Sequence, residues 1–239
     1  MKRLGVIGGL GPMATAYFMQ LVIEMTQAET DQEHIETIIY SMPSIPDRTS
    51  YILGKSSESP LPALIEVGQK LCAMQVSCIA IPCVTAHYFH RELEEHIHVP
   101  IINGIQETVH CLKANGVTAA GLMATDGTLQ SRLFQHWLES AGITVITPDA
   151  YHQRQLMSVI YDNVKAGKPV NMEAFLAAAK YLRENGAEVN LLGCTELSIV
   201  KRDHAIGAGY LDVMEVLAGA AVERCGRLRR EYRWPITGR

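Results

Sequence analysis

The sequence lacks the features that mark several classes of protein. It has no uninterrupted apolar run of about 18 residues, so we expect no membrane-spanning helix. No secretory cleavage pattern follows the basic N-terminus. The 21 Lys and Arg residues do not outnumber the 25 Asp and Glu residues, and the formal charge of −4 argues against a nucleic-acid binder. We therefore expect a cytoplasmic protein with neither a nucleic-acid nor a membrane partner.

The six cysteines include no C-x-x-C pair. In a chain of 239 residues without a signal peptide, an even cysteine count is weak evidence for disulfides, and most of these residues are expected to be free thiols. Cys83, His87 and His90 could share one helical face, but no further ligand with zinc spacing accompanies them. We expect no metal site.

Nearly half of the sequence, 48%, is hydrophobic, and short apolar runs alternate with longer amphipathic ones. This alternation is typical of β-α-β units and a parallel sheet. The polar segment 41–59 interrupts the pattern and is interpreted as a functional surface loop. The predicted strands are 3–8, 35–42, 77–82, 99–102, 117–123, 143–146, 188–193 and 209–211. The predicted helices are 13–28, 60–75, 85–95, 104–114, 127–140, 150–167, 171–185 and 212–231.

An offset of 111 residues aligns segment 63–83 with segment 174–194 without a gap. Both copies contain an amphipathic helix, a turn, an apolar strand and then a cysteine followed by a threonine-containing helix start. The similarity indicates either the common pattern of α/β units or two related half-proteins. On the second interpretation the fold is α/β with two pseudo-symmetric lobes, each a parallel sheet flanked by helices, and the active site lies in the cleft between them. The first lobe is then 1–103 plus 212–239, and the second is 104–211.

Cys83 and Cys194 each follow a predicted buried strand and precede a predicted helix. Open α/β sheets bind ligands at the carboxyl ends of their strands. A helix start favours the thiolate, so we expect the pKa of both cysteines to lie below the usual 8.5 or so. Two such groups on opposite faces of one carbon are what a stereoinversion needs, because one removes a proton while the other delivers one.

Three segments carry a resemblance to a known family: IGGLGPMAT (7–15), PCVTAH (82–87) and LLGCTEL (191–197). With SIPDRT (44–49), ATDGT (124–128) and YDNVKAGK (161–168), they resemble the aspartate/glutamate racemase superfamily, most of all its aspartate racemase branch. The resemblance covers essentially the whole chain. It implies a cofactor-independent racemase with two pseudo-symmetric α/β lobes, acting on a small acidic amino acid and commonly forming a homodimer.

The resemblance also implies roles for individual residues. Cys83 and Cys194 become the acid–base pair, and Arg48 and Lys165 bind substrate carboxylates. Glu196 would tune Cys194 or relay protons from it. The other residues implied to bind substrate are Thr85, Thr128, Thr195, Met13 and Val84, and Gly9, Gly11 and Pro12 are implied to form the first wall of the pocket.

Val84 departs from the family pattern, which usually has asparagine at this position. Valine cannot donate or accept a hydrogen bond through its side chain, and losing such a partner costs on the order of 1–3 kcal/mol. The leading hypothesis is racemisation of aspartate, with glutamate second. A related isomerase or decarboxylase of a small carboxylate, or a catalytically silent binder of an acidic ligand, remains an alternative.

The segment Gly9-Leu10-Gly11-Pro12-Met13-Ala14 also matches a G-x-G-x-x-A dinucleotide fingerprint. A dinucleotide site would have an acidic residue at the end of the second strand, where this chain has Tyr40, Ser41 and Met42. Pro12 also removes one amide donor from the phosphate-binding turn. Nicotinamide binding is therefore not the preferred interpretation.

Overall fold

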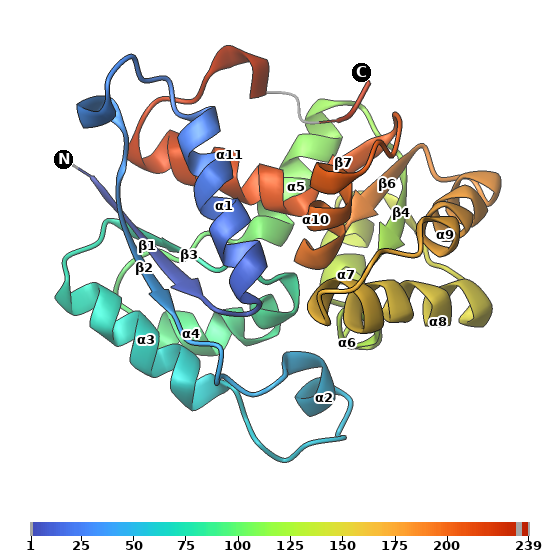
Figure 1. Ribbon diagram of the computed structural model, residues 1–239, viewed down its shortest axis with the longest axis horizontal. Helices are drawn as coiled ribbons and strands as arrows, with labels where there is room; N and C mark the ends of the chain where they lie inside the picture. Colours follow the sequence, from blue (N-terminus) through green and yellow to red (C-terminus); the bar gives the residue numbers. More distant parts are fainter. Residues whose placement is uncertain (1, 233–235, 239) are drawn as a thin grey trace.

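Two parallel β-sheets covered by helices make up the protein, as the computed structural model of residues 2–232 and 236–238 shows (Figure 1). The expected α/β class with two helix-flanked sheets is confirmed. The first sheet has the order β2-β1-β3, with β1 at Arg3–Gly8, β2 at Glu36–Ser41 and β3 at Cys78–Ala80. The second has the order β5-β4-β6-β7, with β4 at Ala119–Met123, β5 at Thr144–Ile146, β6 at Val189–Leu192 and β7 at Tyr210–Asp212.

The two sheets are connected in the same order. In each, the first strand lies between the second and the third, and the third continues toward a fourth position. In the second sheet β7 occupies that position; in the first, a single parallel bridge joins Ile101 to Ile79. The predicted strand 99–102 is thus reduced to a bridge. Pro100 accounts for this, because proline has no N–H to donate to a ladder.

The helices mostly follow the predicted segments, with several differences. The segment 85–95 forms a 3₁₀-helix followed by a short α-helix. The segment 127–140 is split at Arg132, which has a positive φ of 54°. The segment 150–167 ends as a π-helix. The α-helix predicted over 212–231 ends earlier, at Cys225. A short helix also forms in the predicted loop, where the Asp47 side chain accepts a hydrogen bond from the Ser50 N–H at 2.8 Å.

The helix bounds are as follows. The α-helices are α1 (Pro12–Met25), α2 (Arg48–Ile52), α3 (Leu61–Ala73), α4 (His90–His96), α5 (Gly104–Ala114), α6 (Asp126–Gln130), α7 (Leu133–Ser140), α8 (Ala150–Ser158), α9 (Met172–Glu184), α10 (Thr195–Asp203) and α11 (Val213–Cys225). The 3₁₀-helices are η1 (Asp31–Glu33), η2 (Val84–Phe89) and η4 (Arg230–Tyr232), and the π-helix is η3 (Val159–Lys165).

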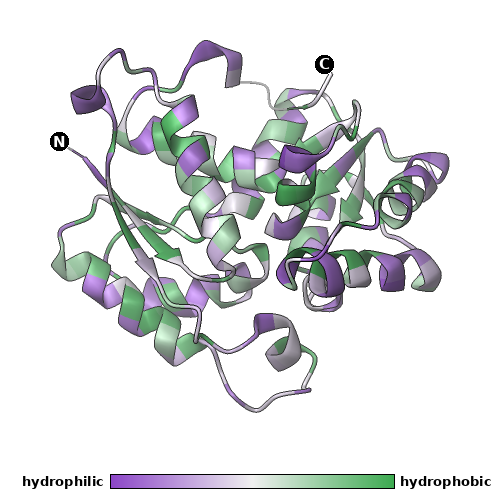
Figure 2. Ribbon diagram, in the orientation of Figure 1, coloured by the Kyte–Doolittle hydropathy of each residue, from purple (hydrophilic) through white to green (hydrophobic). Residues whose placement is uncertain are grey.

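Hydrophobic residues are frequent in the strands of both sheets, and the helices carry both hydrophobic and hydrophilic residues (Figure 2). Two helices pack on the opposite sheet from the one that precedes them in the sequence. Helix α5 comes after the first sheet but packs on α7 and on the core of the second, whereas α11 comes after β7 but packs on α1, β1 and β3. Helices α5 and α11 also pack on each other. The lobe boundaries at 103/104 and 211/212 stay predictions.

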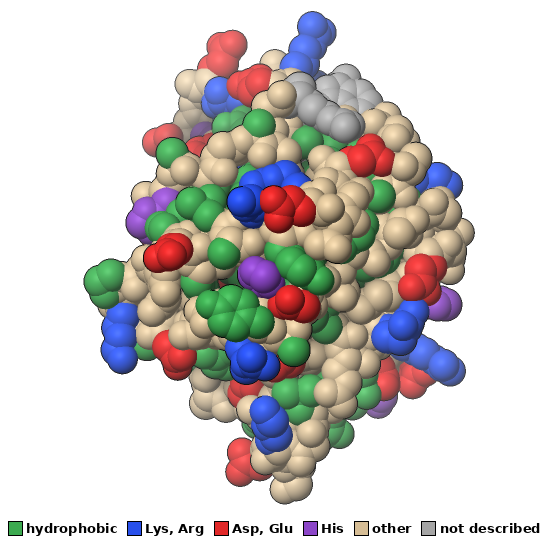
Figure 3. All heavy atoms as spheres, turned by 90° about the vertical axis from the view of Figure 1, so that its right-hand side faces the viewer, with side chains coloured by type: hydrophobic (Ala, Val, Ile, Leu, Met, Phe, Trp, Pro, Cys, Tyr) green, Lys and Arg blue, Asp and Glu red, His purple; other side chains and the backbone are tan. Residues whose placement is uncertain are grey.

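On the side of the molecule that carries α8 and α9, acidic and basic side chains are interspersed (Figure 3). Within the described part of the chain, every helix is too short or too polar to cross a membrane.

Gly9 determines how the chain leaves β1. Its φ is +92°, and a Cβ atom there would lie 2.5 Å from the backbone nitrogen of Met42. The Met42 N–H donates to the Gly8 carbonyl at 3.1 Å, so the two backbones are held together at this point. Only glycine fits both the left-handed conformation and the close approach.

We predict that Gly9→Ala lowers the free energy of unfolding by roughly 3 kcal/mol or more, because the added methyl group meets backbone atoms. Gly54→Ala is the matched control, since Gly54 also has a positive φ (+68°) but open space around it. The control is expected to lose only about 1–2 kcal/mol, the cost of the left-handed conformation. Urea denaturation measures both; equal losses would show that the Met42 contact is unimportant.

Candidate active site

Cys83 and Cys194 line one pocket between the two sheets. Each cysteine follows the carboxyl end of the third strand of its sheet and directly precedes a helix. Both are buried, with 6% and 5% of their surfaces exposed. The structure thus brings together the two sulfurs that the sequence pairs at an offset of 111. The other residues that line this inner pocket are Leu10, Asp47, Arg48, Thr49, Val84, Thr85, Thr125, Tyr161, Lys165, Thr195 and Glu196.

The inner pocket is almost filled by side chains. Its free volume is about 10 Å³, which is close to the space that one water molecule needs. A larger outer pocket of about 410 Å³ adjoins it, and the two share Leu10, Asp47, Arg48, Lys165 and Glu196. A ligand that entered from the outer pocket would have to displace some of these shared side chains to reach the sulfurs.

Arg48 places a buried positive charge beside Cys83. Its Nη1 donates to the Ile45 and Pro46 carbonyls at 3.1 and 2.8 Å, and its Nη2 donates to the Leu10 carbonyl at 3.1 Å. Its Nε is buried and has no hydrogen-bond partner among the described residues. Burial opposes the charge, but the nearby Cys83 and Asp47 outweigh it and hold the pKa of Arg48 above its usual value. One edge of the guanidinium is thus left to bind an anion.

Glu196 connects Cys194 to Lys165. The Cys194 thiol donates to Oε2 of Glu196 at 2.9 Å, and Lys165 Nζ lies 2.8 Å from Oε1. Burial first, and the Glu196 charge next, raise the pKa of Cys194 well above its ordinary value, and Lys165 offsets only part of this. The expectation that the helix start lowers this pKa is wrong for Cys194, because desolvation and a neighbouring carboxylate outweigh the helix dipole.

Three threonine hydroxyls form a buried cluster beside the cysteines. Thr85 follows Cys83, whereas Thr125 and Thr128 belong to the start of α6, and the three oxygens lie 3.1–3.2 Å apart. Thr85 and Thr125 line the inner pocket, and Thr128 is fully buried behind them. Thr195 lines the pocket next to Cys194, and its hydroxyl lies 3.4 Å from Oε2 of Glu196.

The remaining predicted site residues lie around these two pockets. Val84 lines the inner pocket and belongs to the apolar cluster that includes Ile105 and Val109 of α5. The others line only the outer pocket: Gly9, Gly11, Pro12 and Met13, of which Pro12 and Met13 are exposed.

Sequence reasoning missed Tyr161 as a pocket residue. Its hydroxyl donates to Oδ2 of Asp47 at 3.3 Å, and burial raises its pKa. Asp47, which lies in the predicted surface loop, both caps α2 and lines the two pockets. Thr125 was also missed, although the T-D-G-T pattern marks the helix start that it caps. Nothing in the sequence around Leu10 and Thr49 indicates that these residues line a pocket.

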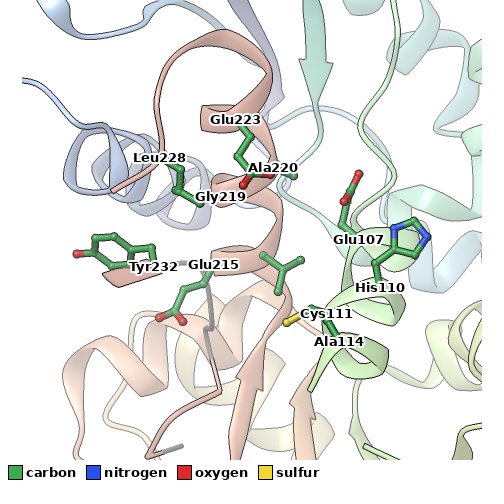
Figure 4. A pocket seen from close by; sticks show the side chains of 11 residues that line it. Glu107, His110, Cys111, Ala114, Glu215, Gly219, Ala220, Glu223, Leu228 and Tyr232 are labelled. Carbon is green, nitrogen blue, oxygen red and sulfur yellow. The ribbon is translucent and has the colours of Figure 1, made fainter. Parts of the chain in front are cut away.

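A further pocket of about 230 Å³ lies between α5 and α11 (Figure 4). It is lined by three carboxylates, of which Glu107 pairs with Arg224 and Glu215 with Lys201. Neither Cys83 nor Cys194 lines it. Within residues 2–232 and 236–238, no group of three or more His, Cys, Asp or Glu side chains is placed to hold a metal ion.

Comparison with known proteins identifies the family of the chain. The family model for Asp/Glu/hydantoin racemases matches residues 7–221. The chain belongs to this family. The prediction of a racemase is therefore confirmed, and the family places this chain among the isomerases.

Individual relatives extend the comparison. Aspartate racemase of Picrophilus torridus has a similar structure, with a TM-score of 0.85, 30% identity and coverage of 98% of this chain and 99% of its own. The broad specificity amino-acid racemase RacX of Bacillus subtilis is 28% identical over 206 residues, 82% of this chain and 86% of the relative. Glutamate racemase of Francisella tularensis shares the fold, with a TM-score of 0.67, 16% identity and coverage of 93% and 80%.

His87 ties the Cys83 segment to the start of α5. Its Nε2 accepts a hydrogen bond from the Gly104 N–H at 3.1 Å, so Nδ1 carries the proton and donates to the Cys83 carbonyl at 3.1 Å. Burial first, and His90 next, lower the pKa of His87 from 6.5 to about 4. The folded protein therefore holds this imidazole in its neutral form.

We predict that the free energy of unfolding falls as the pH drops from about 6.5 toward 4, because in this range the unfolded chain protonates His87 and the folded chain does not. In His87→Gln the dependence on pH is expected to become shallower, and in the control His98→Gln, an exposed position, to stay unchanged. Urea denaturation at several pH values measures this; an equal dependence in all three proteins would contradict the assignment.

We predict that Glu196→Gln lowers the pKa of Cys194, because the negative charge that opposes the thiolate is lost while Lys165 remains nearby. The ultraviolet absorbance of the thiolate, followed against pH, reports this pKa. The double variant Cys194→Ser/Glu196→Gln supplies the baseline, so the difference belongs to Cys194 alone. An unchanged or higher pKa would show that Glu196 does not control this thiol.

Proposed function

We propose that this chain racemises an acidic amino acid without a cofactor, by proton transfer between Cys83 and Cys194. Aspartate is the leading substrate and glutamate the second. The observation that carries the proposal is that both cysteines line one pocket from equivalent positions of two equally connected sheets. A racemase needs this arrangement because the proton must leave one face of Cα and return to the other.

The charged groups around the two sulfurs differ. Cys194 holds its proton, which it donates to Glu196. Cys83 lies beside the buried Arg48 guanidinium, which compensates a negative charge on sulfur. In this proposal the Cys83 thiolate removes the Cα proton from one enantiomer, and the Cys194 thiol delivers a proton to the opposite face. The enzyme then holds a thiol at Cys83 and a thiolate at Cys194, ready for the other enantiomer.

The carboxylates of the substrate are proposed to bind at the two cationic groups. The free Nε edge of Arg48 suits a carboxylate, and Lys165 can exchange its partner Glu196 for another. The hydroxyls of Thr85 and Thr195 provide further hydrogen bonds at the pocket wall. Positive groups fixed around Cα stabilise the charge that develops when the proton leaves, and they do so most strongly where water is excluded.

The second candidate function is racemisation of a wider range of amino acids, and Val84 favours it. This apolar side chain lines the pocket where the family pattern has an amide. An apolar wall discriminates poorly between side chains of similar size. The relative from Bacillus subtilis is itself named a broad specificity racemase. A homodimer is proposed only from the family resemblance, and light scattering would test it.

The decisive test is exchange at Cα in heavy water without added pyridoxal phosphate. We expect deuterium to enter aspartate, and we expect Cys83→Ser and Cys194→Ser each to reduce racemisation by roughly a hundredfold to ten-thousandfold, the usual contribution of an acid–base group. Cys72→Ser, outside both pockets, should retain it. Either active-site variant turning over at the original rate would contradict the two-base mechanism.

A panel of D- and L-amino acids in the same assay separates the candidate functions. Turnover of aspartate and glutamate alone supports the acidic substrate, and turnover of neutral amino acids supports the wider range. Release of carbon dioxide that requires only one cysteine would indicate a decarboxylase. Binding of an acidic amino acid with no exchange at Cα would indicate a silent relative.

A further inference from the structure

Two cysteines outside the proposed active site lie in contact. The sulfur atoms of Cys78 and Cys225 are 3.4 Å apart, although 147 positions separate the residues in sequence. Cys78 is the first residue of β3, and Cys225 is the last residue of α11. Neither residue lines the pocket that contains Cys83 and Cys194. Both are free thiols in this structure.

The backbone holds both sulfurs in this position. Cys78 is fixed within β3, where it pairs with Leu4 of β1. The chain that follows α11 is bonded to the end of α1: the Gln27 N–H donates to the Arg227 carbonyl at 2.8 Å, and the Arg229 N–H donates to the Met25 carbonyl at 2.9 Å. The contact between the sulfurs therefore joins two anchored elements.

The two thiols differ in access and in chemical character. Cys225 is half-buried, whereas Cys78 is buried. The hydrogen bond from Cys78 lowers the pKa of Cys225, burial partly opposes this, and the positive charges of Lys2 and Arg224 lower the pKa further. The same hydrogen bond and burial raise the pKa of Cys78. A half-buried thiol with a lowered pKa beside a buried thiol is the arrangement of an attacking and a resolving cysteine.

We propose that Cys78 and Cys225 form an oxidisable dithiol, which a hydroperoxide converts into an intrachain disulfide between β3 and α11. The Cys225 thiolate attacks one peroxide oxygen, the O–O bond breaks, and an alcohol (or water, from hydrogen peroxide) leaves after taking a proton from solvent. The sulfur of Cys78 then attacks the resulting Cys225 sulfenic acid. The S–O bond breaks, water leaves with the Cys78 proton, and the S–S bond forms.

Few atoms need to move for this reaction. A disulfide has an S–S distance of about 2.05 Å, so the sulfurs approach each other by little more than an ångström. The new bond would join the strand that leads to Cys83 to a helix that packs on both α1 and α5. Oxidation at this site would therefore covalently link two elements that are now joined only by noncovalent contacts.

The test uses the purified, reduced protein and an equimolar amount of hydrogen peroxide. Free thiols are then alkylated and the protein is digested for mass spectrometry. We expect a crosslinked peptide pair that contains Cys78 and Cys225 and that disappears when dithiothreitol is added before alkylation. Because the readout is a crosslink rather than activity, the result is independent of the proposed racemase function.

Two variants make the assignment specific. Cys225→Ser is expected to abolish the crosslink, and Cys111→Ser, which alters another half-buried thiol, is expected to retain it. The melting temperature should rise on oxidation of the unaltered protein and not of Cys225→Ser, because the disulfide constrains the unfolded chain. The proposal is overturned if Cys78 and Cys225 remain open to alkylation while other cysteines oxidise, or if the crosslinks join other pairs.

Discussion

Compensation of buried charge is the constraint on which the rest of the site depends. Glu196 is only 4% exposed, yet its carboxylate carries a charge that burial would otherwise oppose. It is stabilised by the ammonium of Lys165 on one oxygen and by the thiol of Cys194 on the other. Arg48, equally buried, is stabilised by three backbone carbonyls. These partners hold each charge at a defined place around the two sulfurs.

The shared strand order of the two sheets explains why both cysteines line the same pocket. In each sheet the third strand runs parallel to the first, and its cysteine appears where the strand passes into a helix. Because both third strands end at a common pocket, these two positions become part of the same lining. Helices α5 and α11 exchange sides and pack on each other, so the core of each half includes a helix that follows the other sheet.

Close packing of the inner pocket has a dynamic consequence. Pockets for small molecules usually measure roughly 300–1,000 Å³, far more than the free volume between the cysteines. Lys165 is one of the side chains that separate the outer pocket from the sulfurs. We expect it to move, because its side chain is a quarter exposed and it is the last residue of a π-helix. Such helices are often found at functional sites. Movement of this side chain toward the outer pocket would open a route to both sulfurs while leaving Arg48 in place.

Periodicity predicted the α/β class and the order of most elements, whereas the two-sheet fold and the equivalence of Cys83 and Cys194 also needed the 111-residue offset and the family resemblance. Such properties can be predicted from local patterns, because a strand or helix that buries one face has hydrophobic residues at a regular spacing along the sequence. Only the tertiary structure decided that Cys194 keeps its proton, that Thr128 lies behind the pocket wall and that Cys78 touches Cys225. A side chain's pKa and its contacts depend on groups that folding brings from distant parts of the chain, and no pattern of neighbouring residues encodes them.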